Sequence, residues 1–168
     1  PVLLRPRVTN TYDQGAPGGA HYHLVTMTVA DGVDPFTGVG VDPVATTYGY
    51  SPPAGTATSD PSSGWVHKQA TSVSVSSPEG TLTSRVLYDA RGRAIRSSKP
   101  GSELTGTDAG VTSTLFYTAG THPEEVACGA HPEWAGQPCL TRVAGAVTGH
   151  NPATAAATLP VKQVTGYN

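Results

Sequence analysis

Apolar and polar residues alternate clearly in the segment His21–Val29. Val25, Met27 and Val29 fall on one side of an extended chain, and Thr26 and Thr28 fall on the other. A period of two is typical of a strand with one face packed and one face in water. The pattern therefore predicts a half-buried β-strand over His21–Val29.

Further short segments show the same character, and turn residues separate them. The predicted strands are Pro1–Tyr12, Val44–Tyr50, Trp65–Ser76, Leu82–Tyr88 and Val111–Tyr117. The Pro-, Gly- and Ser-rich segment Ser51–Gly64 predicts a loop. Thr121–Cys128, with Thr121 as its N-cap, and Ala153–Thr158 allow at most short helical turns. The pattern predicts an all-β fold of successive antiparallel hairpins.

The segment Arg85–Pro100 has the features of one complete β-hairpin. Val86 and Tyr88 share one strand face, and Arg93–Ser97 returns as a second strand. Between them, Asp89–Gly92 forms the turn, because Asp caps nearby backbone N–H groups and Gly tolerates a positive φ. Pro100 ends the second strand.

This hairpin resembles one unit of the RHS/YD-repeat family, of the kind found in actinobacteria. The residues that match the repeat are Tyr88, Asp89, Gly92, Arg93 and Pro100, and the similarity extends over roughly Leu82–Val143 through Glu133–Gly136 and Cys139. The resemblance implies hairpins wound into a twisted sheet, as part of a larger β-shell or spiral. In many members that shell encloses a toxic C-terminal domain.

Weaker copies of the repeat occur elsewhere, at Tyr12–Gly15, at Tyr117–Gly120 and at Val164–Asn168. Spacings from Tyr12 to Tyr48, Tyr88 and Tyr117 are 36, 40 and 29 residues, which is too irregular for fixed rungs. We expect residues 1–168 to be a single fragment of a repeat array. Its parts are degenerate hairpins (1–80), the best-formed repeat (81–101), a degenerate repeat with a Cys-closed loop (102–145) and the start of another repeat (146–168).

Composition limits the classes of partner. Charged residues make up 13% of the chain and the net charge is −2, against a typical charged share of roughly 25%. The nearest basic cluster, around Arg91, is explained by a solvated hairpin face. We therefore expect no nucleic-acid partner. No run of 18 apolar residues occurs, so we expect no membrane insertion.

Cys128 and Cys139 are the two cysteines, and they flank a turn-rich segment. This pattern favours a disulfide that closes the loop in a secreted or cell-surface protein. The alternative is a pair of buried free thiols in a reducing compartment.

Few residues suggest chemistry. His21 and His23 provide two ligands, too few for a structural zinc site, and we expect no metal and no cofactor. Trp65 and Trp134 are candidates for stacking on a sugar ring. Paired carboxylates for sugar hydrolysis could come from Glu124, Glu125 and Glu133, although the first two fit the first turn of a short helix better.

Three functions remain open at this point. The first is a non-catalytic structural segment of an encapsulating RHS/YD-repeat shell, whose partners are the rest of the array and an enclosed toxin domain. The alternative is an extracellular carbohydrate-binding or cell-wall module with a cell-surface glycan as its partner. A secreted hydrolase is less favoured, because no nucleophile elbow or similar motif is present. Asp34-Pro35 and Asp42-Pro43 lack the downstream pattern of the family's self-cleaving segment.

Overall fold

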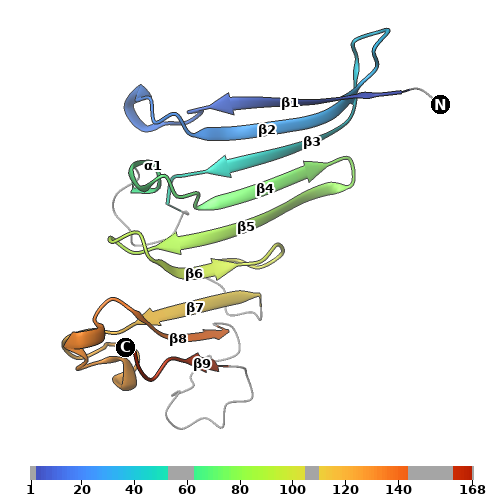
Figure 1. Ribbon diagram of the computed structural model, residues 1–168. Coiled ribbons are helices and arrows are strands. Elements are labelled where there is room, and N and C mark those ends of the chain that lie inside the picture. Colours follow the sequence, from blue (N-terminus) through green and yellow to red (C-terminus); the bar gives the residue numbers. More distant parts are fainter. Residues whose placement is uncertain (1–2, 53–62, 105–109, 144–160, 168) are drawn as a thin grey trace. The chain divides into compact units, whose positions relative to one another are not determined.

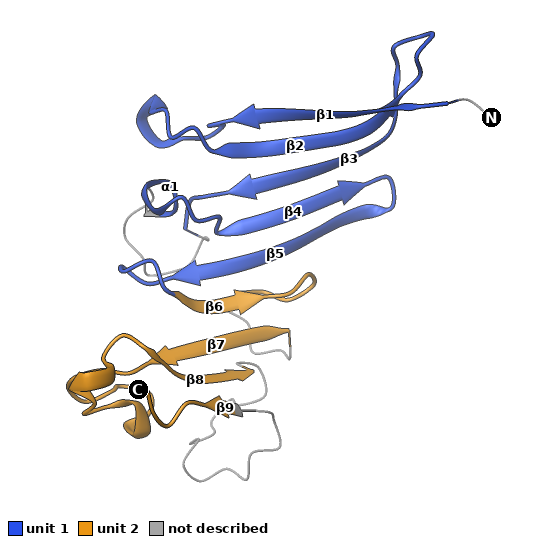
Figure 2. Cartoon of the chain, viewed as in Figure 1, with its two compact units in different colours: residues 1–93 blue, residues 94–168 orange. Residues whose placement is uncertain are grey.

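The computed structural model describes residues 3–52, 63–104, 110–143 and 161–167. These residues form nine β-strands with antiparallel neighbours, one short α-helix and single turns of 3₁₀ helix. The all-β prediction is confirmed. The chain divides into two compact units, residues 1–93 and 94–168 (Figure 2).

The first unit is an antiparallel meander (Figure 1). Its five strands follow one another in chain order: β1 (Arg5–Tyr12), β2 (Val25–Val33), β3 (Gly40–Gly49), β4 (Ser72–Ser77) and β5 (Gly80–Tyr88). The short helix α1 (Ser63–His67) precedes β4. A 3₁₀ turn at Pro17–Gly19 lies in the connection between β1 and β2.

The second unit repeats this order on a smaller scale. It contains β6 (Ala94–Ser98), β7 (Val111–Phe116), β8 (Pro138–Val143) and β9 (Val161–Gln163), each paired antiparallel with the next. Two 3₁₀ turns, Val126–Cys128 and Pro132–Trp134, lie between β7 and β8. Connections of this kind suit a chain rich in Gly and Pro.

The register of β1–β5 sorts the side chains onto two different faces. One face, here called the apolar face, carries Val8, Ala30, Val44, Tyr48, Val73, Val75, Leu82 and Val86, with the polar residues Asn10, Thr28, Thr46 and Ser84 between them. The opposite face carries Met27, Val29 and Ala45 on β2 and β3. On β4 and β5 it carries two hydroxyl pairs, in which the side-chain oxygens of Ser74 and Thr83 lie 2.9 Å apart and those of Ser76 and Thr81 lie 2.8 Å apart. On the apolar face, the side chains of Val8 and Leu82 are each 64% exposed.

Each unit has its own small core. In the first, the rings of Tyr50 and Trp65 are buried beside Thr71. In the second, the core contains Leu115, Tyr117, Cys128, Cys139 and Leu140. Val111, Leu115 and Tyr117 alternate along β7 and the residue after it, and all three are buried.

The predicted strand Trp65–Ser76 is wrong in its first half, where α1 and a connecting segment stand instead. Gly64 explains the difference: a Cβ built there would lie 1.9 Å from the carbonyl oxygen of Tyr50. The helical turn thus approaches the backbone after β3 closely, and it places Trp65 against Tyr50. This contact is a tertiary one, which a local pattern cannot reveal.

Other element boundaries also differ from the prediction. β2 begins at Val25 and not at His21, and it continues through Asp31-Gly32 to Val33. The 3₁₀ turn before Gly129 is capped by Glu125 and not by Thr121. The sequence pattern does not predict strands β8 and β9. The segment Ala153–Thr158 and most of the loop Ser51–Gly64 lie outside the described residues.

Candidate functional site

The turn after β5 is organised by the carboxylate of Asp89. Its Oδ1 accepts hydrogen bonds from the backbone N–H groups of Arg91 and Arg93, each at 2.9 Å. The Asp89 N–H donates to the carbonyl oxygen of Arg93 at 2.9 Å, which closes the turn. The Asp89 Oδ2 also accepts from Nε of Arg93 at 2.7 Å. One side chain therefore fixes both the backbone and the Arg93 guanidinium.

Gly92 completes this turn with a φ of 75°, in the left-handed region that favours glycine. Its carbonyl oxygen accepts a hydrogen bond from Nε2 of Gln69 at 2.9 Å. A Cβ at this position would lie 3.1 Å from Oε1 of Gln69. Pro100, the last residue of the repeat motif, lies exposed two residues after β6.

The charge state of Asp89 reflects this environment. Burial alone raises the pKa of its carboxyl group, but hydrogen bonds from Arg93 and Arg91 outweigh burial and hold that pKa below its usual value. The carboxylate is thus the form that stabilises the turn.

Asp13, in the weaker Tyr12-Asp13 copy, makes similar bonds to the backbone after β1. Its N–H donates to the carbonyl oxygen of Leu24 at 2.9 Å. Its two carboxylate oxygens accept from the N–H groups of His23 and Leu24, each at 3.0 Å. The turn is longer, yet the aspartate again ties the end of one strand to the start of the next.

Tyrosine hydroxyl groups form a second recurring contact. Tyr50, directly after β3, donates to the carbonyl oxygen of Val25, the first residue of β2 (2.9 Å). Tyr88, the last residue of β5, donates to the carbonyl oxygen of Ala70 ahead of β4 (3.2 Å). In the second unit, Tyr167 follows β9 and donates to the carbonyl oxygen of Pro138, the first residue of β8. Each bond joins the end of an odd-numbered strand to the start of the strand before it.

Tyr117 departs from this arrangement. It follows β7, but its hydroxyl donates to the carbonyl oxygen of Val164, beyond β9. Burial raises the pKa of Tyr50, Tyr88 and Tyr117. All three hydroxyl groups therefore remain protonated donors at neutral pH.

These contacts change the repeat spacing that the sequence suggested. Tyr50, and not Tyr48, is the equivalent of Tyr88. Of these two tyrosines of the described region, it is Tyr50 whose hydroxyl donates a hydrogen bond to the preceding strand. The tyrosines Tyr12, Tyr50 and Tyr88 are then spaced by 38 and 38 residues. The first unit thus has a regular period of two strands and 38 residues, which does not appear when Tyr48 is counted in place of Tyr50.

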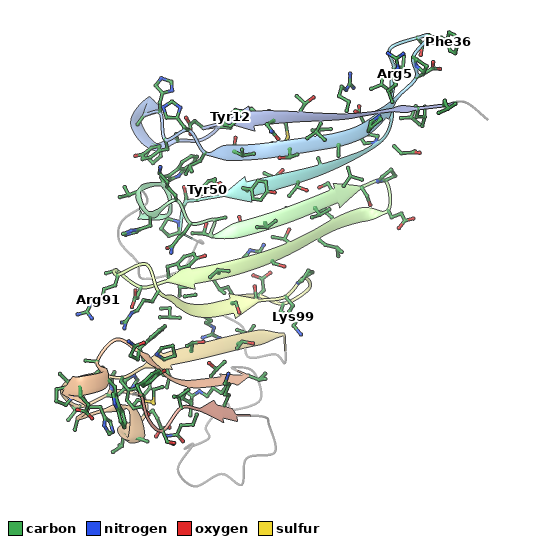
Figure 3. All side chains as sticks on the ribbon, viewed as in Figure 1. Arg5, Tyr12, Phe36, Tyr50, Arg91 and Lys99 are labelled. Atoms are coloured by element: carbon green, nitrogen blue, oxygen red, sulfur yellow. A yellow bond between two sulfur atoms is a disulfide. The ribbon has the colours of Figure 1, made fainter. Side chains whose placement is uncertain are left out.

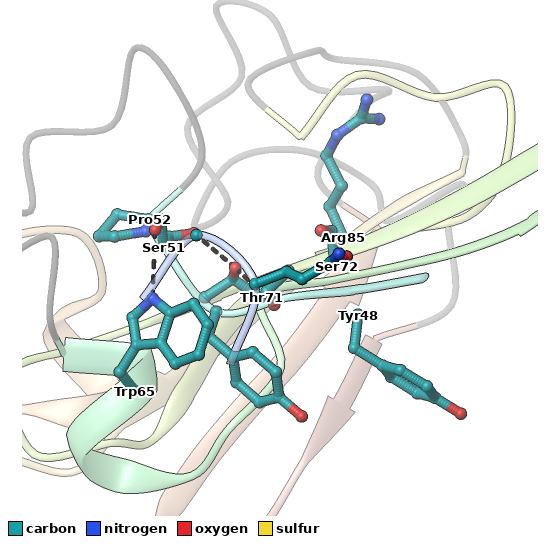
Figure 4. Close-up of a pocket in the computed structure, with 11 residues that line it drawn as sticks. Tyr48, Ser51, Pro52, Trp65, Thr71, Ser72 and Arg85 are labelled. Carbon is teal, nitrogen blue, oxygen red and sulfur yellow. Dashed lines mark hydrogen bonds between the residues drawn. The ribbon is translucent and has the colours of Figure 1, made fainter. Parts of the chain in front are cut away.

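A hollow of about 340 Å³ lies next to Tyr48 and Tyr50 (Figure 4). Tyr48, Trp65, Thr71 and Arg85 contribute to its wall. Trp65 is only 2% exposed, and its Nε1 donates to Oγ of Ser51 at 3.3 Å. The Trp65 ring is therefore buried, with the ring centres of Tyr22 and Tyr50 5.4 and 4.9 Å from its own, whereas stacking on a sugar requires an exposed ring face.

Trp134 lies half-buried in the loop between β7 and β8. The ring of His131 stacks on it, with the ring centres 4.7 Å apart and the planes at 12°, and Tyr117 meets it edge-on. Cys128 and Cys139 form the predicted disulfide, which closes this loop. Glu133 lies beside Trp134 in the same loop. Hydrogen bonds from its own backbone N–H and from the His131 side chain lower the pKa of the Glu133 carboxyl group. These contacts anchor the loop on the core of the second unit.

The described residues hold no group of three or more His, Cys, Asp or Glu side chains that could bind a metal ion. His21 and His23 lie before β2, with their ring centres 6.4 Å apart. Of the three glutamates considered for hydrolysis, Glu124 pairs with Arg142 and Glu125 caps a 3₁₀ turn. No described helix is both long and apolar enough to cross a membrane.

Comparison with known proteins gives no identification. No protein-family model, no curated protein and no solved structure matches this chain.

Proposed function

We propose that this chain is a non-catalytic structural segment of an RHS/YD-repeat protein, in which its hairpins form part of the wall of a hollow β-shell. The observation that carries the proposal is the shared bonding of Tyr12-Asp13 and Tyr88-Asp89. In both pairs the tyrosine ends a strand and the aspartate ties it to the next one. A hydrogen-bonding pattern that recurs in this way is typical of an array of repeated hairpins.

The arrangement of β1–β5 supports a role as a wall. The five strands follow one another in a single layer, and one face carries exposed Val8 and Leu82. Apolar side chains on a sheet face are stabilised when another element covers them. The partners in this proposal are the rest of the repeat array and an enclosed domain, against which the apolar face would lie. The disulfide fits an oxidising compartment, so we place the protein outside the cell or on its surface.

Limited proteolysis of the full-length gene product that contains these residues tests the proposal. A segment within a shell wall resists cleavage, and a domain inside the shell is protected until the wall is opened. Weakening the wall with Gly92→Val should therefore expose the enclosed domain to protease. Release of this segment as a free, stable fragment, with no change in the digestion of the remainder, would contradict the proposal.

A further inference from the structure

Arg85 is a partly buried arginine on β5 whose charge has no partner in the part of the chain that the structure describes. Arg7, Arg93 and Arg142 each form an ion pair with a carboxylate. The side chain of Arg85 makes neither an ion pair nor a hydrogen bond with the described residues. Its guanidinium therefore offers a positive charge and a planar set of N–H donors to a ligand.

Arg85 stands in a row with two small residues on the neighbouring strands. Ser72 lies directly opposite Arg85 on β4, and Gly49 lies opposite Ser72 on β3. A Cβ at Gly49 would lie 2.3 Å from Oγ of Ser72, so the row has room for the hydroxyl only because Gly49 has no side chain. All three residues line the hollow of about 340 Å³. In Figure 4, Arg85 extends to one side of the strands and Tyr48 extends to the other.

The rest of the wall is held in place by hydrogen bonds that do not involve Arg85. The hydroxyl of Thr71 contacts the carbonyl oxygens of Gly49 and Ser51 at 3.1 and 2.5 Å. The indole N–H of Trp65 donates to Oγ of Ser51 at 3.3 Å. Of the described residues that line the hollow, Arg85 is the one that is charged at neutral pH. The hollow is thus a preformed site with a single positive charge.

We propose that this hollow binds a small ligand of the hexuronic acid class, which carries one carboxylate and several hydroxyl groups, and that Arg85 binds the carboxylate. The guanidinium fork matches a carboxylate with two parallel hydrogen bonds, and one cation balances one negative charge. The Ser72 hydroxyl and the Gln14 amide also belong to the lining and make no side-chain hydrogen bond with the described residues. They offer neutral hydrogen bonds to the ligand's hydroxyl groups. The volume lies within the usual range of small-molecule sites, roughly 300–1,000 Å³.

The site is separate from the apolar face. Arg85 and Val86 are consecutive on β5, so their side chains point to opposite faces of the sheet. A domain that covers the apolar face would therefore leave Arg85 accessible. The proposed ligand site adds to the wall function and does not depend on it.

Titration of the 168-residue chain with sodium glucuronate, followed by NMR of the backbone amides, tests the site. We expect saturable shifts at Gly49, Ser72 and Arg85, with a dissociation constant of roughly 1 mM for so small a ligand. Glucose has a similar ring without the carboxylate and should bind at least roughly tenfold more weakly. Shifts that do not saturate, or equal binding of glucose and glucuronate, would overturn the proposal.

Two charge-removing variants test the role of Arg85. Arg85→Gln should weaken glucuronate binding by at least roughly tenfold. Arg91→Gln is the matched control, because it removes the same charge from an exposed position in the turn after β5 (Figure 3) and should bind glucuronate as the wild type does. Arg85→Lys keeps the charge without the planar fork and should give an intermediate affinity. Equal affinities of Arg85→Gln and Arg91→Gln would overturn the proposal.

Glucose 6-phosphate distinguishes a carboxylate site from a phosphate site. The single cation of the hollow predicts that glucose 6-phosphate binds more weakly than glucuronate. Tighter binding of the phosphate would overturn the assignment to a carboxylate ligand. Failure of the ligand site would leave the turn contacts and the proposed function standing, because neither depends on the Arg85 side chain.

Discussion

The hydroxyl group of Tyr88 donates a hydrogen bond to the carbonyl oxygen of Ala70, 3.2 Å away, and so joins the end of β5 to the segment that enters β4. The two residues are 18 positions apart in the sequence. Tyr50 makes the equivalent bond to Val25. These bonds join residues that are further apart in the sequence than the residues of one turn. They hold neighbouring strands together at the same end of the unit.

Removing the hydroxyl group of Tyr88 should lower the free energy of unfolding without disturbing the packing of the Tyr88 ring. We expect Tyr88→Phe to destabilise the chain by about 1 kcal/mol, since the carbonyl of Ala70 loses its partner. That loss lowers the unfolding temperature by about 4–8 °C for a unit of this size, measured by circular dichroism. Tyr48→Phe is the control, because its hydroxyl makes no hydrogen bond to the described residues. Equal midpoints for both variants would remove the structural role of Tyr88.

Gly92 should tolerate no β-branched residue. Its φ of 75° opposes Gly92→Val, and so does Gln69, whose Oε1 would lie 3.1 Å from the new Cβ. We expect a loss of about 1–3 kcal/mol in the free energy of unfolding, measured by urea denaturation. Gly120→Val is the matched control, because a Cβ there meets nothing within 4 Å and no positive φ is required. A loss at Gly120 as large as that at Gly92 would refute the turn assignment.

Acid should loosen the Asp89 turn. The pKa of Asp89 is lower in the folded chain than in the unfolded chain, so its carboxylate stabilises the fold fully above the unfolded value of about 4. That contribution is lost as the pH falls through the lower folded value. We expect the unfolding temperature to fall below about pH 4, and to fall less steeply in Asp89→Asn. The Asp89→Asn variant keeps part of the dependence of the unfolding temperature on pH, because the pKa of Asp13 is also lowered in the folded chain. If the unfolding temperatures of the variant and the wild type changed equally with pH, protonation of Asp89 would not be linked to folding.

The disulfide should matter mainly for the second unit. Cys128 and Cys139 are 0% and 1% exposed and lie within its core. Replacing both with alanine should cost about 3 kcal/mol on the chain-entropy account of loop closure. Hydrogen exchange should rise in β7 and β8 and should remain unchanged in β1–β5. Uniform loosening of the whole chain would contradict the division into two units.

The sequence predicted those features that depend on local chemistry. The Asp89–Gly92 turn follows from an Asp that caps backbone N–H groups and a Gly that takes a positive φ. The alternation of Val25, Met27 and Val29 correctly indicated a strand, although β2 starts at Val25. The pairing of Cys128 with Cys139 required only that two cysteines flank one loop.

Features that depend on distant contacts could not be predicted in this way. The burial of Trp65 depends on Tyr50 and on the absence of a side chain at Gly64, neither of which marks a helix locally. Tyr48 and Tyr50 fall on the same strand face, so periodicity could not show which of them repeats. The hydrogen bond of Tyr50 to Val25 decides between them.

Electron cryomicroscopy of the full-length gene product is the most direct test of the proposed function. The account predicts that residues 1–168 form part of a closed β-shell wall, with Tyr50 and Tyr88 hydrogen-bonded to the preceding strands as described. A reconstruction in which these residues project as a separate domain, with no enclosed space beside the apolar face, would contradict it.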